Sequence, residues 1–365
     1  MQAAEQDFDY LGRLNRAQRL AAEFGGRDGA GCFTAPPLLI IAGAGTGKTM
    51  TLAHRVAHLV VQGVAAERIL LLTFTRRAAQ EMTRRVENIV RASTRDAAPL
   101  PSGGLPWSGT FHSIANRLLR RFAHNLGLDP GFSVLDRGDA ADMIDVVRHE
   151  LGLTRASRRF PKKDTCLAIY SRRVNTQKPL AETLEQFYPW CADWSDELGE
   201  LFRHYVERKQ HNQSLDYDDL LLYWKHLVAE PEFAEEIGSW FDHVLVDEYQ
   251  DTNLVQAEIL KALKPRGNGV TVVGDDAQSI YSFRAAEVEN ILGFPDQFIP
   301  TAQVITLEQN YRSTQPVLDA ANCLIAQSER QYRKNLHSER RDGARPAYVT
   351  VEDGDAEAEF VLSLI

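Results

Sequence analysis

Five apolar runs, each followed by a helix-like segment, constrain the fold of this chain more than any other feature. The runs lie in "PPLLIIAGAG", "RILLLTFT", "FDHVLVDEYQDT", "GVTVVGDDAQ" and "AQVITLEQNYRS". Helical patterns such as "GKTMTLAHRVAHLV" and "RRAAQEMTRRVENIV" come after them. Strands that are apolar throughout and alternate with helices are typical of a parallel sheet covered on both faces. The sequence therefore predicts an α/β fold built on a parallel sheet.

A long segment of different character separates the second run from the third. It opens with the Pro/Gly/Ser-rich "ASTRDAAPLPSGGLPWSG" and continues with helical periodicity, as in "IANRLLRRFAHNL" and "LDYDDLLLYWKHLV". The simplest organisation is an α/β domain over residues 1–91 and 240–303, with a helical insertion over residues 92–239.

The composition excludes some classes of partner. The chain of 365 residues has a net charge of −9, so a nucleic-acid site has to be a local basic patch on an acidic protein. Its apolar runs are shorter than the ~20 residues that span a bilayer, and the acidic N-terminus lacks a secretion signal. We therefore expect a cytoplasmic protein that does not bind membranes. The four cysteines have the scattered spacing of reduced thiols, not that of a metal site: Cys32, Cys166, Cys191 and Cys323.

A glycine-rich loop joins the first apolar run to its helix. Its residues, "AGAGTGKT", have the spacing of a P-loop, with alanine in place of the usual first glycine. The glycines let backbone N–H groups point at phosphate oxygens, Lys48 would reach the β- and γ-phosphates, and Thr49 would bind Mg²⁺. A chance glycine-rich turn is the alternative, but the strand before it and the helix after it favour phosphate binding. The residues expected around the nucleotide are Ala42, Gly43, Ala44, Gly45, Thr46, Gly47, Lys48, Thr49 and Met50.

Two acidic residues complete the predicted phosphate site. The apolar run in "HVLVDEYQD" ends at Asp247 and Glu248. Asp247 could hold Mg²⁺, and Glu248 could orient and deprotonate the attacking water. Acids at a strand end can also cap a following helix, but a P-loop upstream makes that interpretation weaker. The sequence therefore predicts a P-loop NTPase that hydrolyses its nucleotide.

Five further segments indicate what the hydrolysis drives. They are "LNRAQ", "LLLTFTRRAAQEM", "WSGTFHS", "VVGDDAQSIYSFRAA" and "LEQNYRS". Gln18 in the first segment carries an amide that can pair with the N6 and N7 edge of adenine. In this order, together with the P-loop and the acid pair, these motifs closely resemble the UvrD/Rep-type superfamily 1 DNA helicases over nearly the whole chain.

The resemblance implies a fold, a function and partners. The family has two RecA-like domains with ATP between them, a helical insertion in each, and single-stranded DNA across the top. Its members use ATP to move 3′-to-5′ on single-stranded DNA and to unwind duplex at junctions. That activity serves DNA repair, replication or recombination. Residues 304–365 would begin the second RecA-like domain.

Only 53 residues follow Arg312, whereas a complete domain usually needs about 100–150. The second domain would be incomplete, and its remaining half or a partner chain would have to supply a second arginine. We therefore expect weak ATP hydrolysis and little unwinding from this chain. A shortened protein, a gene fragment and one chain of a split enzyme all fit. Two other functions also fit: the motor half of a helicase–nuclease, and an ATP-dependent DNA- or partner-binding module that does not unwind.

The resemblance also implies roles for single residues around the nucleotide. Gln18 would recognise adenine, and Tyr311 would stack on it. Gln278 would sense the γ-phosphate, and Arg312 would act as an arginine finger. Met50 stands where the family often has an arginine beside the base, so nucleotide affinity is expected to be weaker. The expected catalytic residues are Lys48, Asp247, Glu248, Gln278 and Arg312.

DNA-contacting positions are implied in the same way. Tyr281 and Phe283 would stack against bases, an interaction worth about 1–3 kcal/mol per base that tolerates any sequence. Core aromatics and a structural histidine are the alternatives for these segments. The positions that match are Phe74, Thr75, Thr110, Phe111, His112, Tyr281 and Phe283.

A basic stretch between residues 155 and 178 is independent evidence for nucleic-acid binding. Eight Lys and Arg residues lie there with Phe160 and Tyr170 between them and only Asp164 opposing. Such a concentration on an acidic chain can follow a phosphate backbone. A solvated helix face paired with acids from elsewhere is the alternative. The expected contacts are Arg158, Arg159, Lys162 and Lys163.

Overall fold

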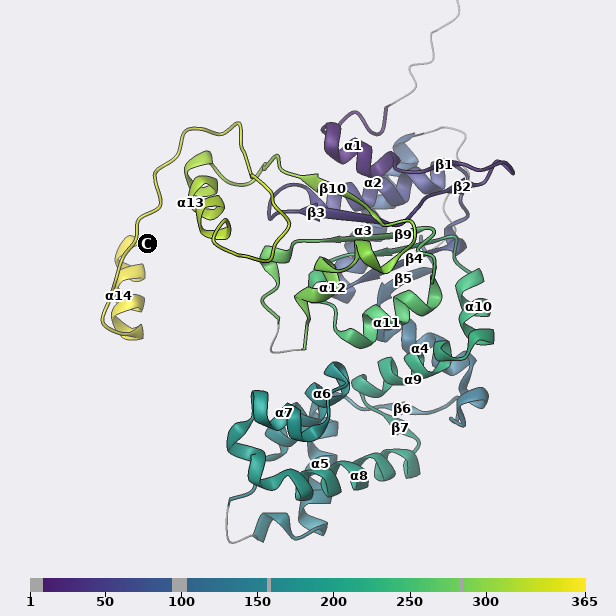
Figure 1. Ribbon diagram of the computed structural model, residues 1–365, viewed down its shortest axis with the longest axis vertical. Helices are drawn as coiled ribbons and strands as arrows, with labels where there is room; N and C mark the ends of the chain where they lie inside the picture. The colour runs from purple at the N-terminus through teal and green to yellow at the C-terminus, as the bar shows by residue number, and fades with distance from the viewer. Residues whose placement is uncertain (1–8, 94–103, 156–158, 282–284) are drawn as a thin grey trace, which may run out of the picture.

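A six-stranded parallel sheet forms the centre of the computed structural model, which describes residues 9–93, 104–155, 159–281 and 285–365 (Figure 1). The strand order across the sheet is β10-β3-β9-β8-β4-β5. The α/β fold with a parallel sheet, predicted from the apolar runs, is thus confirmed. The six strands are β3 (Leu38–Ala42), β4 (Ile69–Thr73), β5 (Trp107–Thr110), β8 (His243–Val246), β9 (Val270–Gly274) and β10 (Gln303–Leu307).

Two of these strands lie outside the sheet domain drawn from the sequence. Strand β5 falls within 92–239, yet it pairs with β4 and forms one edge of the sheet. Its four residues alternate between buried and half-buried, so they lack the continuous apolar run that marks the other strands. Strand β10 covers Gln303–Leu307 and pairs with β3 along its whole length, so the first sheet extends past residue 304.

Helices cover both faces of the sheet, and strand β3 shows why its sequence is apolar throughout. Leu38 and Ile40 pack on one side, whereas Leu39 and Ile41 pack on the other. The first side is covered by α1 (Arg16–Glu23), α2 (Lys48–Val61) and α3 (Arg76–Ser93). The second side is covered by α4 (Phe111–Arg121), α9 (Tyr217–Ala229), α10 (Pro231–Ser239), α11 (Leu254–Leu263) and α12 (Val288–Leu292).

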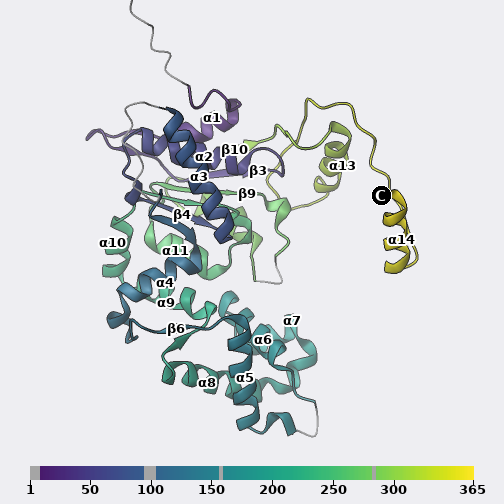
Figure 2. The same cartoon turned by 180° about the vertical axis from the view of Figure 1, so that it is seen from behind.

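A separate helical lobe lies at one end of the molecule (Figures 1 and 2). Its own apolar core runs from Ala140 to Tyr205. The lobe contains α5 (Arg137–Glu150), α6 (Lys163–Thr176), α7 (Leu180–Phe187) and α8 (Ser195–His211). It joins the rest of the protein beside the short parallel pair β6 (Ser133–Val134) and β7 (Ser214–Leu215). The insertion is therefore shorter than 92–239, because α4, α9 and α10 pack on the sheet.

The chain after β10 leaves the sheet domain. Helices α13 (Gln315–Ile325) and α14 (Gly354–Leu364) lie to one side of it in both views (Figures 1 and 2). An antiparallel pair, β1 (Gly26–Arg27) and β2 (Phe33–Thr34), precedes the sheet. Among the described residues, no helix is both long and apolar enough to span a membrane.

Candidate nucleotide and nucleic-acid site

The candidate site lies at the carboxyl ends of neighbouring strands, where both predicted and unpredicted residues meet. The P-loop follows β3, Asp247 follows β8, and Asp275 follows β9. Asn310 comes three residues after β10. Because all these strands are parallel and adjacent, their loops meet at one edge of the sheet, where α/β proteins bind ligands.

The P-loop makes a tight turn into the first residue of α2. Gly45 and Gly47 have φ angles of 82° and 84°, a left-handed conformation that glycine adopts without strain. The Thr46 hydroxyl donates to the Gly43 carbonyl at 2.8 Å and closes the turn. Helix α2 has 14 residues, and its free N–H groups and positive dipole end face the loop, as an anion site requires.

Lys48 forms an ion pair with Glu248 across this loop. The Lys48 side chain is 9% exposed and that of Glu248 is 32% exposed. Gln250 also donates to the Glu248 carboxylate, at 2.9 Å. Glu248 has a left-handed φ of 51°, which is uncommon for a residue with a Cβ and is found at functional sites. The structure thus brings together the predicted phosphate-binding lysine and the predicted general base.

The acids at the end of β8 lie in a poorly solvated place. Burial, and then the nearby Glu248 charge, raise the pKa of Asp247 to about 7, although Lys48 opposes the shift. Burial and Glu248 also raise the pKa of Asp251 to about 6. Asp251, three residues after Glu248, was not singled out from the sequence. Thr49 is half-buried in the first turn of α2. A Thr hydroxyl and a buried carboxylate are oxygen ligands of the kind that Mg²⁺ prefers, so this donor set fits the metal.

Gln18 is almost fully buried, and both ends of its amide are bonded within the protein. Its Nε2 donates to the Thr46 carbonyl at 2.8 Å, and its Oε1 accepts from the Asn15 N–H at 3.0 Å. A Cβ on Gly47 would lie 2.6 Å from that Nε2, so Gln18 packs directly on the P-loop. The pairing of Gln18 with adenine stays a prediction.

Tyr311 and Arg312 are held at the P-loop by the chain after β10. The Tyr311 N–H donates to the Gly45 carbonyl at 2.9 Å, and the Asn15 side chain donates to the Tyr311 hydroxyl at 2.9 Å. A Cβ on Gly45 would lie 2.7 Å from the Arg312 Cβ. Tyr311 is 52% exposed and Met50 is 42% exposed, so both can meet a ligand.

Asn310, which was not among the residues predicted from the sequence, fixes this arrangement. It is 2% exposed, and its Nδ2 donates to the Ala44 carbonyl at 2.6 Å. Its Oδ1 accepts from the backbone N–H groups of Arg312 and Ser313, at 2.9 and 2.8 Å. Its place inside "LEQNYRS" was the only signal in the sequence.

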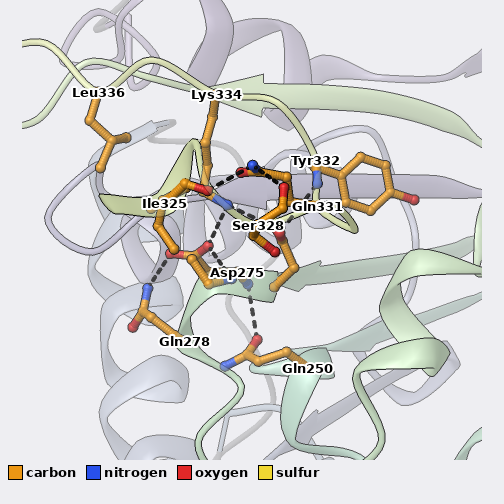
Figure 3. Close-up of polar contacts among 12 residues, drawn as sticks. Gln250, Asp275, Gln278, Ile325, Ser328, Gln331, Tyr332, Lys334 and Leu336 are labelled. Carbon is orange, nitrogen blue, oxygen red and sulfur yellow. Dashed lines mark hydrogen bonds and ion pairs between the residues drawn. The ribbon is translucent and has the colours of Figure 1, made fainter. Parts of the chain in front are cut away.

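Gln278 ends the short helical turn η6 (Asp276–Gln278) after β9. Its Nε2 donates to Asp275 Oδ2 at 2.6 Å (Figure 3). The Asp275 N–H in turn donates to Gln250 Oε1 at 3.0 Å. Since Gln250 also bonds to Glu248, a chain of hydrogen bonds joins the predicted base to the predicted γ-phosphate sensor. Gln250, which links the two, was also not among the residues predicted from the sequence.

A cavity of about 600 Å³ lies between the strand ends and the helical lobe. Residues from both bodies line it, and Asp247 and Glu248 reach it from the phosphate site. Five of the predicted DNA-contacting residues are among those that line it: Phe74, Thr75, Thr110, Phe111 and His112.

The aromatic residues at this cavity differ in their surroundings. Phe74 and Tyr281 lie side by side, with ring centroids 5.5 Å apart. Phe111 is 5% exposed and packs near Trp224 in the core, so it has less surface to offer a base. Phe283 lies outside the described residues.

His112 is held by an aromatic neighbour. The edge of one ring faces the other in the His112–Tyr217 pair, with centroids 5.7 Å apart. Burial lowers the pKa of His112 to about 4, so its ring is neutral at physiological pH.

The predicted basic surface is divided by the structure. Arg159 and Lys162 are exposed, and Arg158 lies outside the described residues. Lys163 forms an ion pair with Asp142 of α5, so an acid from another helix does oppose part of this stretch. The two aromatic residues between the charges, Phe160 and Tyr170, belong to the core of the helical lobe and cannot stack on bases.

Comparison with known proteins agrees with these motifs. The family model of the UvrD/REP helicase N-terminal domain matches residues 27–299, and that of the UvrD-like helicase C-terminal domain matches residues 305–365. The chain is similar to the ATP-dependent DNA helicase PcrA of Bacillus subtilis (strain 168), with 38% identity over 332 residues, 90% of this chain and 43% of that protein.

PcrA of Leuconostoc citreum is 36% identical over 337 residues, which are 91% of this chain and 43% of that protein. PcrA of Staphylococcus epidermidis (strain ATCC 35984) is 35% identical over 336 residues, 91% of this chain and 44% of that protein. The chain spans less than half the length of these relatives. The resemblance found in the motifs is confirmed, and the chain belongs to the UvrD/REP helicase family.

Proposed function

We propose that this chain is the ATP-binding portion of a DNA helicase or translocase that couples ATP hydrolysis to movement 3′-to-5′ along single-stranded DNA. One observation carries the proposal. Hydrogen bonds run from Lys48 through Glu248 and Gln250 to Asp275 and Gln278. Tyr281, three residues after Gln278, touches Phe74 at the cavity. A nucleotide site linked in this way to an aromatic pair, the exposed Phe74 and the half-buried Tyr281, supports a motor better than a simple nucleotide-binding protein.

Binding of ATP changes the partner of Lys48. In this structure the ammonium group is paired with Glu248, so the incoming β- and γ-phosphates have to replace that carboxylate. Once Lys48 binds phosphate, Glu248 keeps the hydrogen bond from Gln250 and has a free lone pair for water. The backbone N–H groups at the start of α2 hold the remaining phosphate oxygens.

Hydrolysis then follows from the position of Glu248. The carboxylate takes a proton from water, the water oxygen bonds to the γ-phosphorus, and the bond to the β-phosphate oxygen breaks to release ADP and phosphate. Thr49 and Asp247 are the residues that would hold Mg²⁺, which neutralises phosphate charge when bound. Arg312 would stabilise the charge on the γ-phosphate, and Gln278 would respond to its loss.

In this proposal Gln18 recognises the adenine and Tyr311 stacks on it, with Met50 beside them. Single-stranded DNA and duplex junctions are the partners we propose for the cavity face, through Phe74, Thr75, Thr110, Phe111, His112 and Tyr281.

Equilibrium binding of a fluorescent ATP analogue tests the phosphate site. We expect the chain to bind the analogue in the presence of Mg²⁺, and Lys48→Ala to weaken binding by at least about tenfold, because a charge-assisted contact to phosphate is lost. The exposed Lys261→Ala in α11 is the matched control. No binding by the unchanged chain, or equal binding by Lys48→Ala, would overturn the proposal.

A further inference from the structure

A segment that follows α13 returns to the sheet domain, and one of its lysines is buried there beside two aspartates. We name residues 326–340 the return segment. Lys334 in this segment is 3% exposed at its side chain, and its Nζ lies 2.8 Å from Asp275 Oδ1 and 2.7 Å from Asp276 Oδ1. Figure 3 shows Lys334 entering from the side of the return segment, with Gln278 and Gln250 on the other side of Asp275.

Lys334 is charged in this position. Burial by itself lowers the pKa of the ammonium group, but Asp275 and Asp276 outweigh that effect and the pKa is raised. The two carboxylates are themselves nearly buried, at 4% and 3% exposed. A buried pair of acids needs a counter-charge, and within the described residues Lys334 supplies it to both.

Asp275 divides its two oxygens between Lys334 and the predicted sensor. Oδ1 meets Lys334, and Oδ2 accepts the hydrogen bond from Gln278 at 2.6 Å. Asp276 is also bonded to the return segment, because its Oδ2 accepts from the Tyr332 N–H at 3.2 Å. The turn η6 is therefore held from one side by the return segment and carries Gln278 on the other.

The return segment also contacts the P-loop. A Cβ on Gly43 would lie 2.8 Å from Leu336 Cδ2, so Leu336 packs on that glycine. Asn335 N–H donates to Glu308 Oε1 at 2.7 Å, which anchors the segment next to the chain that carries Tyr311 and Arg312. The return segment falls within residues 305–365, matched by the C-terminal domain of the family, whereas Asp275 and Gln278 fall within 27–299.

We propose that Lys334 is a positioning residue that neutralises Asp275 and Asp276 and so holds Gln278 in the orientation that distinguishes ATP from ADP. The response to the γ-phosphate then depends on the place of the return segment, which links the C-terminal portion of the protein to the sensor. This inference rests on the proposed function, because it takes Gln278 as the sensor.

The test compares the affinities for ATP and ADP analogues, with Mg²⁺, in four proteins: unchanged, Lys334→Met, Gln278→Ala and the double variant. We expect each single change to reduce the preference for ATP by about tenfold, and the double variant to lose no more than a single one, as for residues in one network. The ADP affinity should stay the same, because the residues that hold the other phosphates are unchanged.

Three comparisons separate positioning from a general loss of structure. Arg333→Ala removes an exposed charge from the neighbouring residue and should leave the ATP preference unchanged. Thermal unfolding shows whether Lys334→Met is folded. Adding Asp276→Asn to Lys334→Met removes one of the two carboxylates that the loss of Lys334 leaves unpaired. This combined variant should regain part of the preference for ATP over ADP, even if Lys334→Met alone is unstable.

An ATP preference in Lys334→Met equal to that of the unchanged protein would overturn the inference and leave the proposed function intact. Additive losses in the double variant would do the same, because Lys334 would then act independently of Gln278. An unchanged protein that binds neither nucleotide would remove the proposed function and this inference with it.

Discussion

The Lys48 ammonium group and the Glu248 carboxylate, which are 200 residues apart in the chain, form an ion pair at the P-loop. In this arrangement Lys48, the residue predicted to bind phosphate, is paired with Glu248, the residue predicted to act as the general base. Neither group can serve a nucleotide until the pair separates. In the proposed mechanism, ATP phosphates would free Glu248 by binding Lys48, which would join nucleotide binding to the activation of water.

Glu248→Gln should separate hydrolysis from binding. The amide cannot take a proton from water, so we predict that single-turnover hydrolysis falls by about 10²–10⁴-fold, the usual contribution of a general base. ATP affinity should be kept or increased, because Lys48 loses its competing charge. Glu235→Gln, on an exposed part of α10, is the control and should change neither quantity. Hydrolysis by Glu248→Gln at the unchanged rate would contradict the assignment of the base.

Asp247→Asn should reveal the raised pKa of that carboxyl group. Its pKa is about 7 in the folded protein, and an unfolded Asp has a pKa of about 3.9. The protonated Asp247 carboxyl group therefore makes its full contribution to stability at pH values below the pKa of the unfolded state. That contribution is lost as the pH rises through the folded-state pKa of about 7.

Because asparagine stays neutral, the stability of Asp247→Asn relative to the unchanged protein should increase by about 1–3 kcal/mol between about pH 5 and pH 8. Denaturant unfolding across this range measures it, with the exposed Asp342→Asn as the control. A difference in stability that does not depend on pH would show that Asp247 is ionised throughout.

Phe74→Ala and Tyr281→Ala should weaken binding of single-stranded DNA. Each removes one ring of the pair at the cavity, and a base stacked on such a ring contributes about 1–3 kcal/mol. The loss should be similar for oligonucleotides of different sequence, because stacking does not read the base. Fluorescence anisotropy with a labelled oligonucleotide measures it. The control is Trp190→Ala, because Trp190 is an aromatic residue on the helical lobe that is 71% exposed. Equal loss in Trp190→Ala would argue against a specific role for the pair.

The basic surface of the helical lobe can be tested with its exposed members. In the double variant Arg159→Ala with Lys162→Ala, the slope of log affinity against log salt should decrease by about 1.4, since each phosphate contact on a single strand contributes about 0.7. Lys261→Ala with Arg266→Ala removes the same charge from an exposed part of the sheet domain and should leave the slope unchanged. A slope unaffected by the first pair would assign Arg159 and Lys162 to an ordinary solvated surface.

Much of the candidate phosphate site could be proposed from sequence, because its residues lie in local motifs. The spacing of Gly43, Gly45, Gly47 and Lys48 specifies a turn into a helix without reference to the rest of the fold. Asp247 and Glu248 were found for a similar reason, since an apolar strand places them at its carboxyl end. Parallel strands in one sheet then bring such ends together.

Two residues that could not be recognised from the sequence, Lys334 and Asn310, act through partners that are distant in the chain. Lys334 meets Asp276 across 58 residues, and Asn310 meets Ala44 across 266. Strand β5 was missed because an edge strand needs only one apolar face. The alternation of charge with Phe160 and Tyr170 was misleading, since both rings point into the core of the lobe.

The affinity for ATP, measured with and without a saturating single-stranded oligonucleotide, tests the central claim most directly. If the nucleotide site and the cavity face are coupled through Gln278, the oligonucleotide should change the ATP affinity by at least about fivefold, a typical coupling between sites. The change should disappear in Gln278→Ala. An ATP affinity that is the same with bound DNA as without it would contradict the account.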